Sequence, residues 1–483
     1  MSWSTYQQAI FDFVANEQGS AIVEAVAGSG KTTTIVEALK HVPAGQRAGF
    51  VAFNKSIAQE LGQRVPQGVD CKTLNGLGHG AVMKGIGKVQ LDTQKTNKLA
   101  KEVVPEEHRE VALAPVKQLV SAAKASGLDA LYAGTEERWA ALGEQFGIEL
   151  PQYSEKDGTR LPVLQWASEV LELGVQRLAT IDFDDQLYLP VRLSLPTPKY
   201  DVLFVDEAQD VSHIQRALVA QALKRGGRLI AVGDSRQAIY GFRGADSRSL
   251  ANIQEQFAAV RLPLTVTYRC PRRVVELAQR YAPELQACEG APQGTVDSVK
   301  QQALYDRVQE GDLILCRNNA PLLRLAYSLI AARVPCHVQG RDIGQGLVNL
   351  IKRLRRAKVG DMLAALDEWE ASALQQAKDQ ENQARMDQIE DQAASIRTVA
   401  EMVNPEDPVG KLIEEIETLF GEQKGVTLSS VHRAKGLEAE RVYILEPERM
   451  PSPRAKKDWE LEQEENLIYV AYTRATKELW FVT

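Results

Sequence analysis

Residues 21–34, AIVEAVAGSGKTTT, constrain the fold of this chain more than any other stretch. An apolar run over residues 21–25 predicts a buried strand, and residues 33–39 are typical of a helix. Glycines between them allow backbone N–H groups to point inward, and the helix N-terminus adds partial positive charge. This order of strand, small-residue turn and helix is that of a phosphate-binding loop.

The residue types of GSGKT, residues 28–32, suit ATP with Mg2+. We expect Lys31 to bridge the β- and γ-phosphates as a point charge and the Thr32 hydroxyl to ligate Mg2+. Ala25 stands where the strict pattern has its first glycine, and a turn without a ligand is the alternative for this stretch taken alone.

Composition indicates an ordinary globular protein of roughly two to four domains, with 44% hydrophobic and 25% charged residues among 483. The net charge is −7, which taken alone argues against a nucleic-acid partner. Any surface that binds nucleic acid must therefore be a local basic groove. One basic run, residues 350–358, fits either a solvated helix face or a DNA contact.

The five cysteines are scattered and include no C-x-x-C pair, which favours reduced thiols. No apolar run reaches the length of a membrane span, and the N-terminus is polar. We therefore expect a cytoplasmic or nucleoid-associated protein with no membrane partner.

Alternating strand and helix patterns predict an α/β fold with two parallel-sheet lobes, each interrupted by a mainly helical insertion. Polar residues follow several predicted strands, and strand ends of this kind converge at one edge of an open sheet. The expected divisions are residues 1–78 and 175–262 for the first lobe, 79–174 for its insertion, 263–345 and 425–483 for the second lobe, and 346–424 for its insertion.

Acidic residues follow the strand that begins near residue 200. Asp206 is a candidate second anchor for Mg2+, since the ion must bridge Thr32 and the phosphates. Glu207 can accept a proton from the attacking water, and Gln237, after the next strand, can reach the γ-phosphate or that water. A helix cap is the alternative for the acidic pair, but its combination with a phosphate-binding loop favours catalysis.

Hydrolysis also requires positive charge on the transferring phosphoryl group. Arg269, at a predicted strand end, and Arg474, at a predicted helix start, are the candidates. For each arginine alone, a surface salt bridge is the alternative.

Taken together, these stretches resemble the superfamily I helicases of the UvrD, Rep and PcrA type, in the same order along nearly the whole chain. The matching stretches begin with WSTYQQAI and AVAGSGKT, in which the alanine is a family trait. Two segments are most similar to the F-box helicase and phage-helicase branch. They are FNKSIA, which lies within the matching stretch VAFNKSIAQEL, and FDD-x-x-YLP (residues 183–190). The remaining matches are VAFNKSIAQEL, KTLNG, DEAQD, GDSRQAIYGFRGA, TYRC, SSVHRAKGLEAE and YVAYTRA.

The resemblance implies two RecA-like lobes that hold ATP and Mg2+ between them. Gln7 would read adenine, Tyr268 would stack on it, and Glu438 would contact the ribose. Thr33 replaces a usual arginine, which would loosen the nucleotide contacts. The implied sets are Lys31, Glu207, Gln237, Arg269 and Arg474 for catalysis, Gln7, Gly28, Ser29, Gly30, Lys31, Thr32, Thr33, Tyr268 and Glu438 for the nucleotide, and Thr32 and Asp206 for the metal.

The resemblance also implies an ATP-dependent helicase that moves 3′ to 5′ on DNA in replication, recombination or repair. Its partners would be single-stranded DNA and single-strand/duplex junctions, with a protein partner that the residues do not identify. Aromatic faces would stack on bases, although core packing is the alternative for each. The implied DNA-binding residues are Phe53, Tyr240 and Phe242 by stacking, and Thr73, Asn75 (usually a histidine), Ser430 and His432 by polar contacts.

Two departures from the family keep alternatives open. The second insertion is shorter than the corresponding domain of UvrD, and the sequence given reaches Thr483 without the strand-separating hairpin expected after YVAYTRA. A translocase that displaces proteins with little unwinding is therefore one alternative. An ATP-gated DNA clamp with weak turnover is another, although Glu207, Gln237, Arg269 and Arg474 are all present.

Overall fold

The computed structural model describes residues 3–52, 54–148, 150–151, 160–239, 248–379, 383–421 and 424–483. The chain forms two compact units. Residues 1–25 and 30–264 belong to the first, and residues 26–29 and 265–483 belong to the second. Four residues of the predicted phosphate-binding turn therefore group with the second unit.

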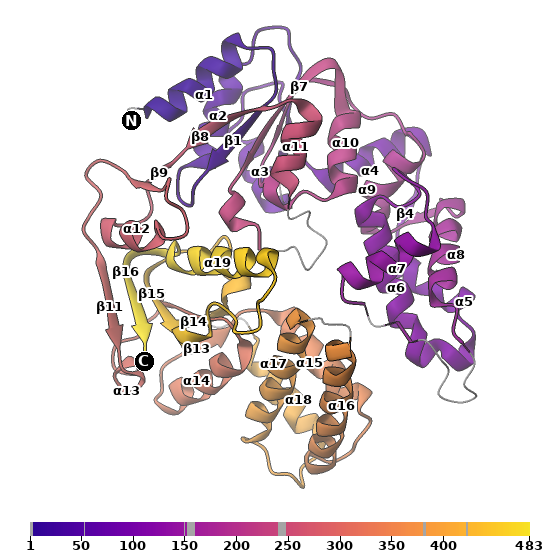
Figure 1. Cartoon of the computed structure of the whole chain (residues 1–483), viewed down its shortest axis with the longest axis vertical. Coiled ribbons are helices and arrows are strands. Elements are labelled where there is room, and N and C mark those ends of the chain that lie inside the picture. Colours follow the sequence, from indigo (N-terminus) through magenta and orange to yellow (C-terminus); the bar gives the residue numbers. More distant parts are fainter. Residues whose placement is uncertain are drawn as a thin grey trace. The chain divides into compact units, whose positions relative to one another are not determined.

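A six-stranded parallel sheet in the order β3-β2-β6-β7-β1-β8 forms the centre of the first unit (Figure 1). Neighbouring side chains of β1 enter different cores, because Ile22 packs with Leu203 whereas Val23 packs with Phe204. Both faces of this sheet are thus covered, as parallel sheets require. The strands are β1 (Ala21–Ala25), β2 (Ala48–Ala52), β3 (Asp70–Thr73), β6 (Tyr200–Val205), β7 (Leu223–Gly233) and β8 (Val260–Leu264).

Helices of the first unit pack on both faces of its sheet (Figure 1). α1 (Thr5–Asn16) contacts α2 (Lys31–Lys40) and β8, while α10 (His213–Ala222) and α11 (Ser249–Phe257) contact β7. The first turn of α1 is stabilised by a capping box between Ser4 and Gln7. The remaining helices beside this sheet are α3 (Lys55–Gly62) and α4 (Leu74–Gly85).

A helical group with its own core follows α4. Trp139, Trp166 and Tyr188 are buried at its centre. Its short strands β4 (Gln90–Leu91) and β5 (Thr180–Ile181) pair in parallel. Its helices are α5 (Lys95–Val103), α6 (Arg109–Ser126), α7 (Glu136–Gln145), α8 (Val163–Gln176) and α9 (Phe183–Arg192).

The second unit has a six-stranded parallel sheet in the order β11-β16-β15-β12-β14-β13. A smaller parallel pair joins β9 (Val266–Thr267) to β10 (Gln286–Ala287). The strands of the larger sheet are β11 (Thr295–Val299), β12 (Leu313–Cys316), β13 (Cys336–Val338), β14 (Val426–Ser430), β15 (Ala439–Leu445) and β16 (Ala475–Val482). Its flanking helices are α12 (Arg272–Ala278), α13 (Gln301–Leu304), α14 (Asn319–Ala331) and α19 (Asp458–Tyr472).

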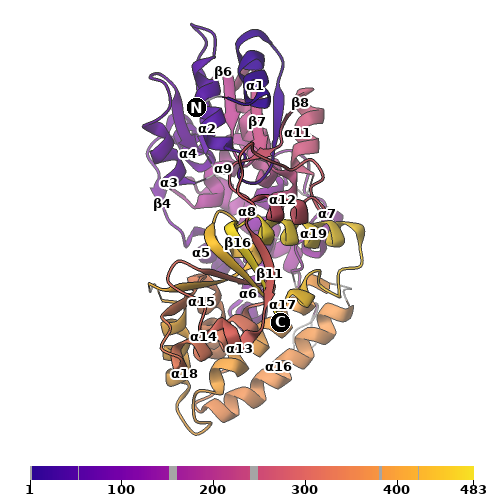
Figure 2. The same ribbon diagram turned by 90° about the vertical axis from the view of Figure 1, so that its left-hand side faces the viewer.

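Four more helices of the second unit share a core with its sheet. Val348 and Leu412 from these helices pack in one cluster with Leu428 of β14 and Tyr443 of β15. α16 lies beside α17 in both views (Figures 1 and 2), and α17 also contacts α14. The helices are α15 (Arg341–Arg353), α16 (Val359–Asp379), α17 (Gln383–Ala400) and α18 (Val409–Leu419).

The predicted α/β fold with two parallel-sheet lobes is confirmed. Within the described ranges, no helix is both long and apolar enough to cross a membrane. The bounds of the four predicted domains stay predictions.

Candidate nucleotide and DNA site

The turn after β1 has the backbone of a phosphate-binding loop. Gly28 and Gly30 have φ angles of 71° and 76°, in the left-handed region that favours glycine. The Thr34 N–H donates to the Gly30 carbonyl at 2.9 Å, and α2 begins at Lys31. The N–H groups of the first helical turn, which have no partner within the helix, therefore lie at this loop.

Ser29 is incompletely bonded in this loop. Its side chain is buried, and within the described part of the chain its Oγ has no hydrogen-bond partner. Burial of a hydroxyl without a hydrogen-bond partner costs about 1–3 kcal/mol of stability, which a ligand that bonded this atom would recover. A phosphate oxygen would satisfy it, and the backbone N–H groups together with the Lys31 ammonium suit the remaining charge.

The predicted acidic pair lies beside Lys31. Lys31 Nζ is 2.9 Å from Glu207 Oε1, with the side chains 14% and 21% exposed. Asp206 is buried, and its Oδ1 accepts a hydrogen bond from the Glu207 N–H at 2.9 Å. Glu207 has φ 50°, a costly conformation for a residue other than glycine and one that is concentrated at functional sites. The residues Lys31, Asp206 and Glu207 are therefore brought together.

A chain of hydrogen bonds continues from Glu207 into the protein interior. Gln209 Nε2 donates to Glu207 Oε2 at 2.5 Å, and Gln209 Oε1 accepts from the Asp234 N–H at 3.1 Å. Gln237 Nε2 donates to Asp234 Oδ2 at 2.6 Å. A Cβ at Gly233 would lie 2.5 Å from Gln209 Oε1, so glycine permits this close approach.

Sequence reasoning assigned no role to Gln209 or Asp234. Both lie in stretches that it singled out, DEAQD and GDSRQ, directly after apolar strands. The sequence signal that could have identified them is a polar residue shortly after each of two apolar strands, since such strand ends converge at one edge of the sheet.

The electrostatics keep Lys31 charged. Burial opposes the charge, but the carboxylates of Glu207, Asp206 and Asp234 outweigh it and raise the pKa of Lys31 to about 12. Burial raises the pKa of Asp234 to about 6, although Lys31 and the Gln237 hydrogen bond act in the opposite direction. A permanent cation thus lies beside a carboxyl group that titrates near neutrality.

Other predicted nucleotide residues of the first unit lie along α1 and α2. Gln7 is buried, its Nε2 donates to Thr34 Oγ1 at 2.9 Å, and its Oε1 accepts from the Ser4 N–H at 3.0 Å. This carboxamide therefore ties α1 to α2. Thr32 is half-buried and Thr33 is exposed.

Two predicted residues of the second unit form an ion pair. Arg269 Nε lies 2.7 Å from Glu438 Oε2, without hydrogen-bond geometry. Tyr268 is 51% exposed, and its N–H donates to the Gly28 carbonyl at 2.8 Å. A Cβ at Gly28 would lie 2.4 Å from Arg269 Cβ, so the loop backbone packs closely against this segment.

Arg474 does not begin a helix, and that prediction is wrong. α19 ends at Tyr472 and β16 begins at Ala475, so Arg474 lies at the helix C-terminus. Its side chain is 1% exposed, and its Nε donates to the Val470 carbonyl at 2.9 Å while Nη1 donates to the Leu437 carbonyl at 3.2 Å. The last carbonyls of a helix lack intrahelical donors, which explains why a guanidinium is favoured there.

The predicted DNA-binding residues lie in both units. Thr73 caps α4, since its Oγ1 accepts from the Gly76 N–H at 3.0 Å. Asn75 donates to α9, Ser430 is buried at the end of β14, and His432 is half-buried in the turn that follows. Three predicted stacking residues, Phe53, Tyr240 and Phe242, lie outside the described residues.

A parallel α/β sheet whose first strand leads into a glycine-containing loop and a helix defines a P-loop protein. The model of the UvrD/REP helicase N-terminal domain matches residues 6–258, and that of the UvrD-like helicase C-terminal domain matches residues 349–483. The chain therefore belongs to the UvrD/REP helicase family.

Curated relatives include the F-box DNA helicase protein 1 of Schizosaccharomyces pombe, 24% identical over 95% of this chain and 55% of the relative. The F-box DNA helicase 1 of Gallus gallus is 25% identical over 95% of this chain and 47% of its own length. The ATP-dependent DNA helicase UvrD2 of Mycobacterium tuberculosis is 25% identical over 96% of this chain and 76% of its own length. The chain thus spans about half the length of the two F-box relatives.

Proposed function

We propose that this chain is an ATP-dependent DNA helicase. The observation that carries the proposal is the Lys31 site, where a buried hydroxyl without a partner adjoins a permanently charged lysine and an acidic pair. Membership of the UvrD/REP family supports both the nucleotide and the DNA substrate.

ATP would be held by the loop N–H groups, Ser29 Oγ and Lys31 Nζ. Lys31 would exchange its 2.9 Å contact with Glu207 for phosphate oxygens, which leaves the Glu207 carboxylate to accept a proton from water. Gln209 would hold Glu207 in place during this exchange through its 2.5 Å hydrogen bond.

Mg2+, when bound, supplies positive charge at the β- and γ-phosphate oxygens. Thr32 and Asp206 are the proposed ligands, because a hydroxyl and a carboxylate provide the hard oxygen donors that Mg2+ prefers. Asp206 is buried, and its Oδ1 accepts the Glu207 N–H, which holds this carboxylate next to the proposed general base.

Arg269 and Arg474 are the proposed cations for the charge that develops during hydrolysis. Arg269 would exchange Glu438 for phosphate, which its partly exposed ion pair permits. Arg474 is deeply buried among backbone carbonyls, so we propose that Arg269 makes the larger contribution.

Single-stranded DNA and its junctions with duplex are the proposed substrates, with movement from 3′ to 5′. The test is strand displacement on duplexes with a 3′ tail, a 5′ tail or no tail, with Lys31→Ala as the inactive control. Displacement from the 3′ tail alone is expected. DNA-stimulated hydrolysis without displacement would indicate a translocase, and no stimulation would contradict the proposal.

A further inference from the structure

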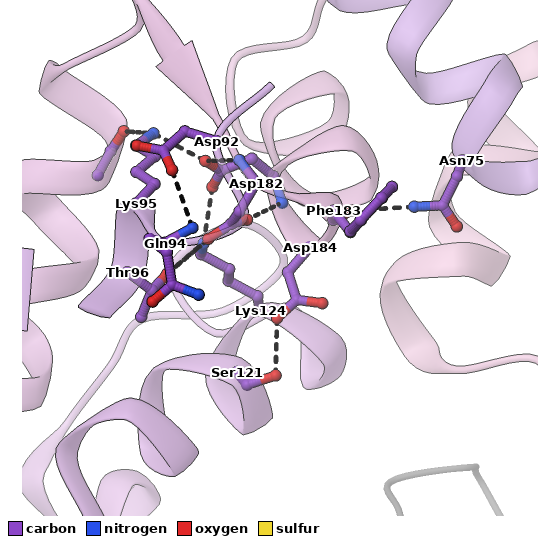
Figure 3. Close-up of polar contacts among 12 residues, drawn as sticks. Asn75, Asp92, Gln94, Lys95, Thr96, Ser121, Lys124, Asp182, Phe183 and Asp184 are labelled. Atoms are coloured by element: carbon purple, nitrogen blue, oxygen red, sulfur yellow. Dashed lines mark hydrogen bonds and ion pairs between the residues drawn. The ribbon is translucent and has the colours of Figure 1, made fainter. Parts of the chain in front are cut away.

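Away from the nucleotide site, the first unit holds a second group of buried charges (Figure 3). Lys95 Nζ lies 2.7 Å from Asp185 Oδ2. Lys124 Nζ lies 2.9 Å from Asp182 Oδ2 and 2.8 Å from Asp185 Oδ1. No side chain of the four is more than 10% exposed. We call Lys95, Lys124, Asp182 and Asp185 the buried ion cluster.

The buried ion cluster joins the helical group to the first turn of α9. Lys95, from α5, also donates to the Gly174 carbonyl of α8 at 2.7 Å, and Lys124 comes from the last turn of α6. Asp182 and Asp185 form the capping box of α9, with hydrogen bonds of 2.8 and 3.1 Å. Three helices are therefore fixed to one helix start.

Stability alone does not explain this arrangement. Two buried lysines and two buried aspartates lose their hydration, and well-packed apolar residues in their place are often as stabilising or more so. Ion pairs and hydrogen bonds differ from apolar contacts in having direction. What the buried ion cluster adds is a defined position and orientation for the start of α9.

The start of α9 holds α4 in turn. Asn75 Nδ2 donates to the Phe183 carbonyl at 2.9 Å and to Gln186 Oε1 at 3.1 Å. A Cβ at Gly78 would lie 1.9 Å from the Gln186 carbonyl oxygen, so the two helices meet along their backbones without slack. The first turn of α4, which follows Thr73 at the end of β3, is therefore held by α9.

We propose that the buried ion cluster is a positioning device for DNA binding, which acts through α9 and Asn75 on the Thr73 corner. The inference rests on the proposed function, which supplies the DNA. Thr73 Oγ1 accepts from Gly76, so its hydroxyl hydrogen can serve a phosphate oxygen. Asn75 acts as a positioning residue and not as a DNA contact, because both hydrogens of its side-chain amide are donated to α9.

The test removes both ion pairs of Lys124 while keeping charge balance and the helix cap. Lys124→Met combined with Asp182→Asn leaves the Lys95–Asp185 pair and retains an oxygen that accepts the Asp185 N–H. In the full chain, the oligothymidylate concentration that half-saturates ATP hydrolysis should rise about tenfold. The KM for ATP and the kcat at saturating DNA should not change. A general loss of folded protein would instead lower the apparent kcat.

The matched control is an exposed ion pair of the same helical group. Arg177 Nη1 and Glu102 Oε2 are 2.6 Å apart, with side chains 51% and 50% exposed. Arg177→Ala combined with Glu102→Ala should leave the half-saturating DNA concentration within about twofold. An equal rise in this control would overturn the proposal.

Asn75→Ala completes a double-mutant cycle. Alone it should raise the half-saturating DNA concentration, and in the Lys124→Met/Asp182→Asn background it should add less than about twofold, because both act along one path. Independent multiplication of the two effects, or no effect of the cluster variant, would overturn the proposal. If the unmodified chain neither binds DNA nor responds to it, the proposed function fails and this inference fails with it.

Discussion

The first unit contains two groups of lysine and carboxylate side chains that differ in completeness. In the buried ion cluster every charge has a partner, and the side chains are 1–10% exposed. At the nucleotide site, Lys31 and Glu207 are 14% and 21% exposed, and the neighbouring Ser29 hydroxyl has no partner within the described residues. A complete group fixes backbone, whereas an incomplete one can exchange partners with a ligand.

Among the variants of both groups, Glu207→Gln at the nucleotide site should have the largest effect on ATP hydrolysis. Hydrolysis should fall about 10²–10⁴-fold, because the general base is lost. ATP affinity should stay the same or increase, since a carboxylate that competes for Lys31 is removed. Steady-state hydrolysis and titration with a fluorescent ATP analogue measure both, with Glu37→Gln on α2 as the control. Undiminished turnover would refute the assignment of Glu207.

Loss of one lysine should affect stability very differently at the two sites. Lys124→Met leaves the buried Asp182 carboxylate without its cation, although Asp185 keeps Lys95, and should cost about 3–5 kcal/mol of unfolding free energy. Lys31→Met should cost less, because Glu207 keeps its Gln209 hydrogen bond and contact with solvent, and Asp234, whose pKa burial already raises to about 6, can bind a proton. Urea denaturation measures both variants. Equal losses of unfolding free energy would show that Lys31 stabilises the fold as much as Lys124 does.

The raised pKa of Asp234 predicts that the nucleotide site makes the free energy of unfolding depend on pH. A carboxyl group whose folded-state pKa is about 6 instead of 3.8 favours folding when protonated, so this contribution is lost as pH rises from about 4 to 6. The full effect is on the order of 3 kcal/mol. Asp234→Asn should remove that slope from the stability profile. A slope unchanged in this variant would contradict the assignment.

Two serines should respond in opposite directions. Ser29→Ala removes a buried hydroxyl without a partner and should stabilise the free protein by about 1 kcal/mol, while ATP affinity falls about tenfold. Ser121→Ala removes the 2.7 Å hydrogen bond to Asp184 and should destabilise by about 0.5–1 kcal/mol, with ATP affinity unchanged. Thermal unfolding with and without MgATP distinguishes these effects. Destabilisation by Ser29→Ala would contradict the comparison.

Local patterns in the sequence predicted most of the fold and the first part of the site. The strand, turn and helix around Lys31 follow from neighbouring residues, and so does the strand that ends before Asp206. The predicted start of a helix at Arg474 failed because an apolar run fits either the end of one helix or the start of another. The ion pair of Lys95 with Asp185 joins residues 90 positions apart, which no local pattern reveals.

The most direct measurement is ATP hydrolysis by the unmodified chain, titrated with single-stranded DNA in the presence of Mg2+. If the Lys31 site is a DNA-coupled ATPase centre, hydrolysis should rise at least about tenfold at saturating DNA and should be lost in Glu207→Gln. Hydrolysis that is absent with and without DNA, or that persists in Glu207→Gln, would contradict this function.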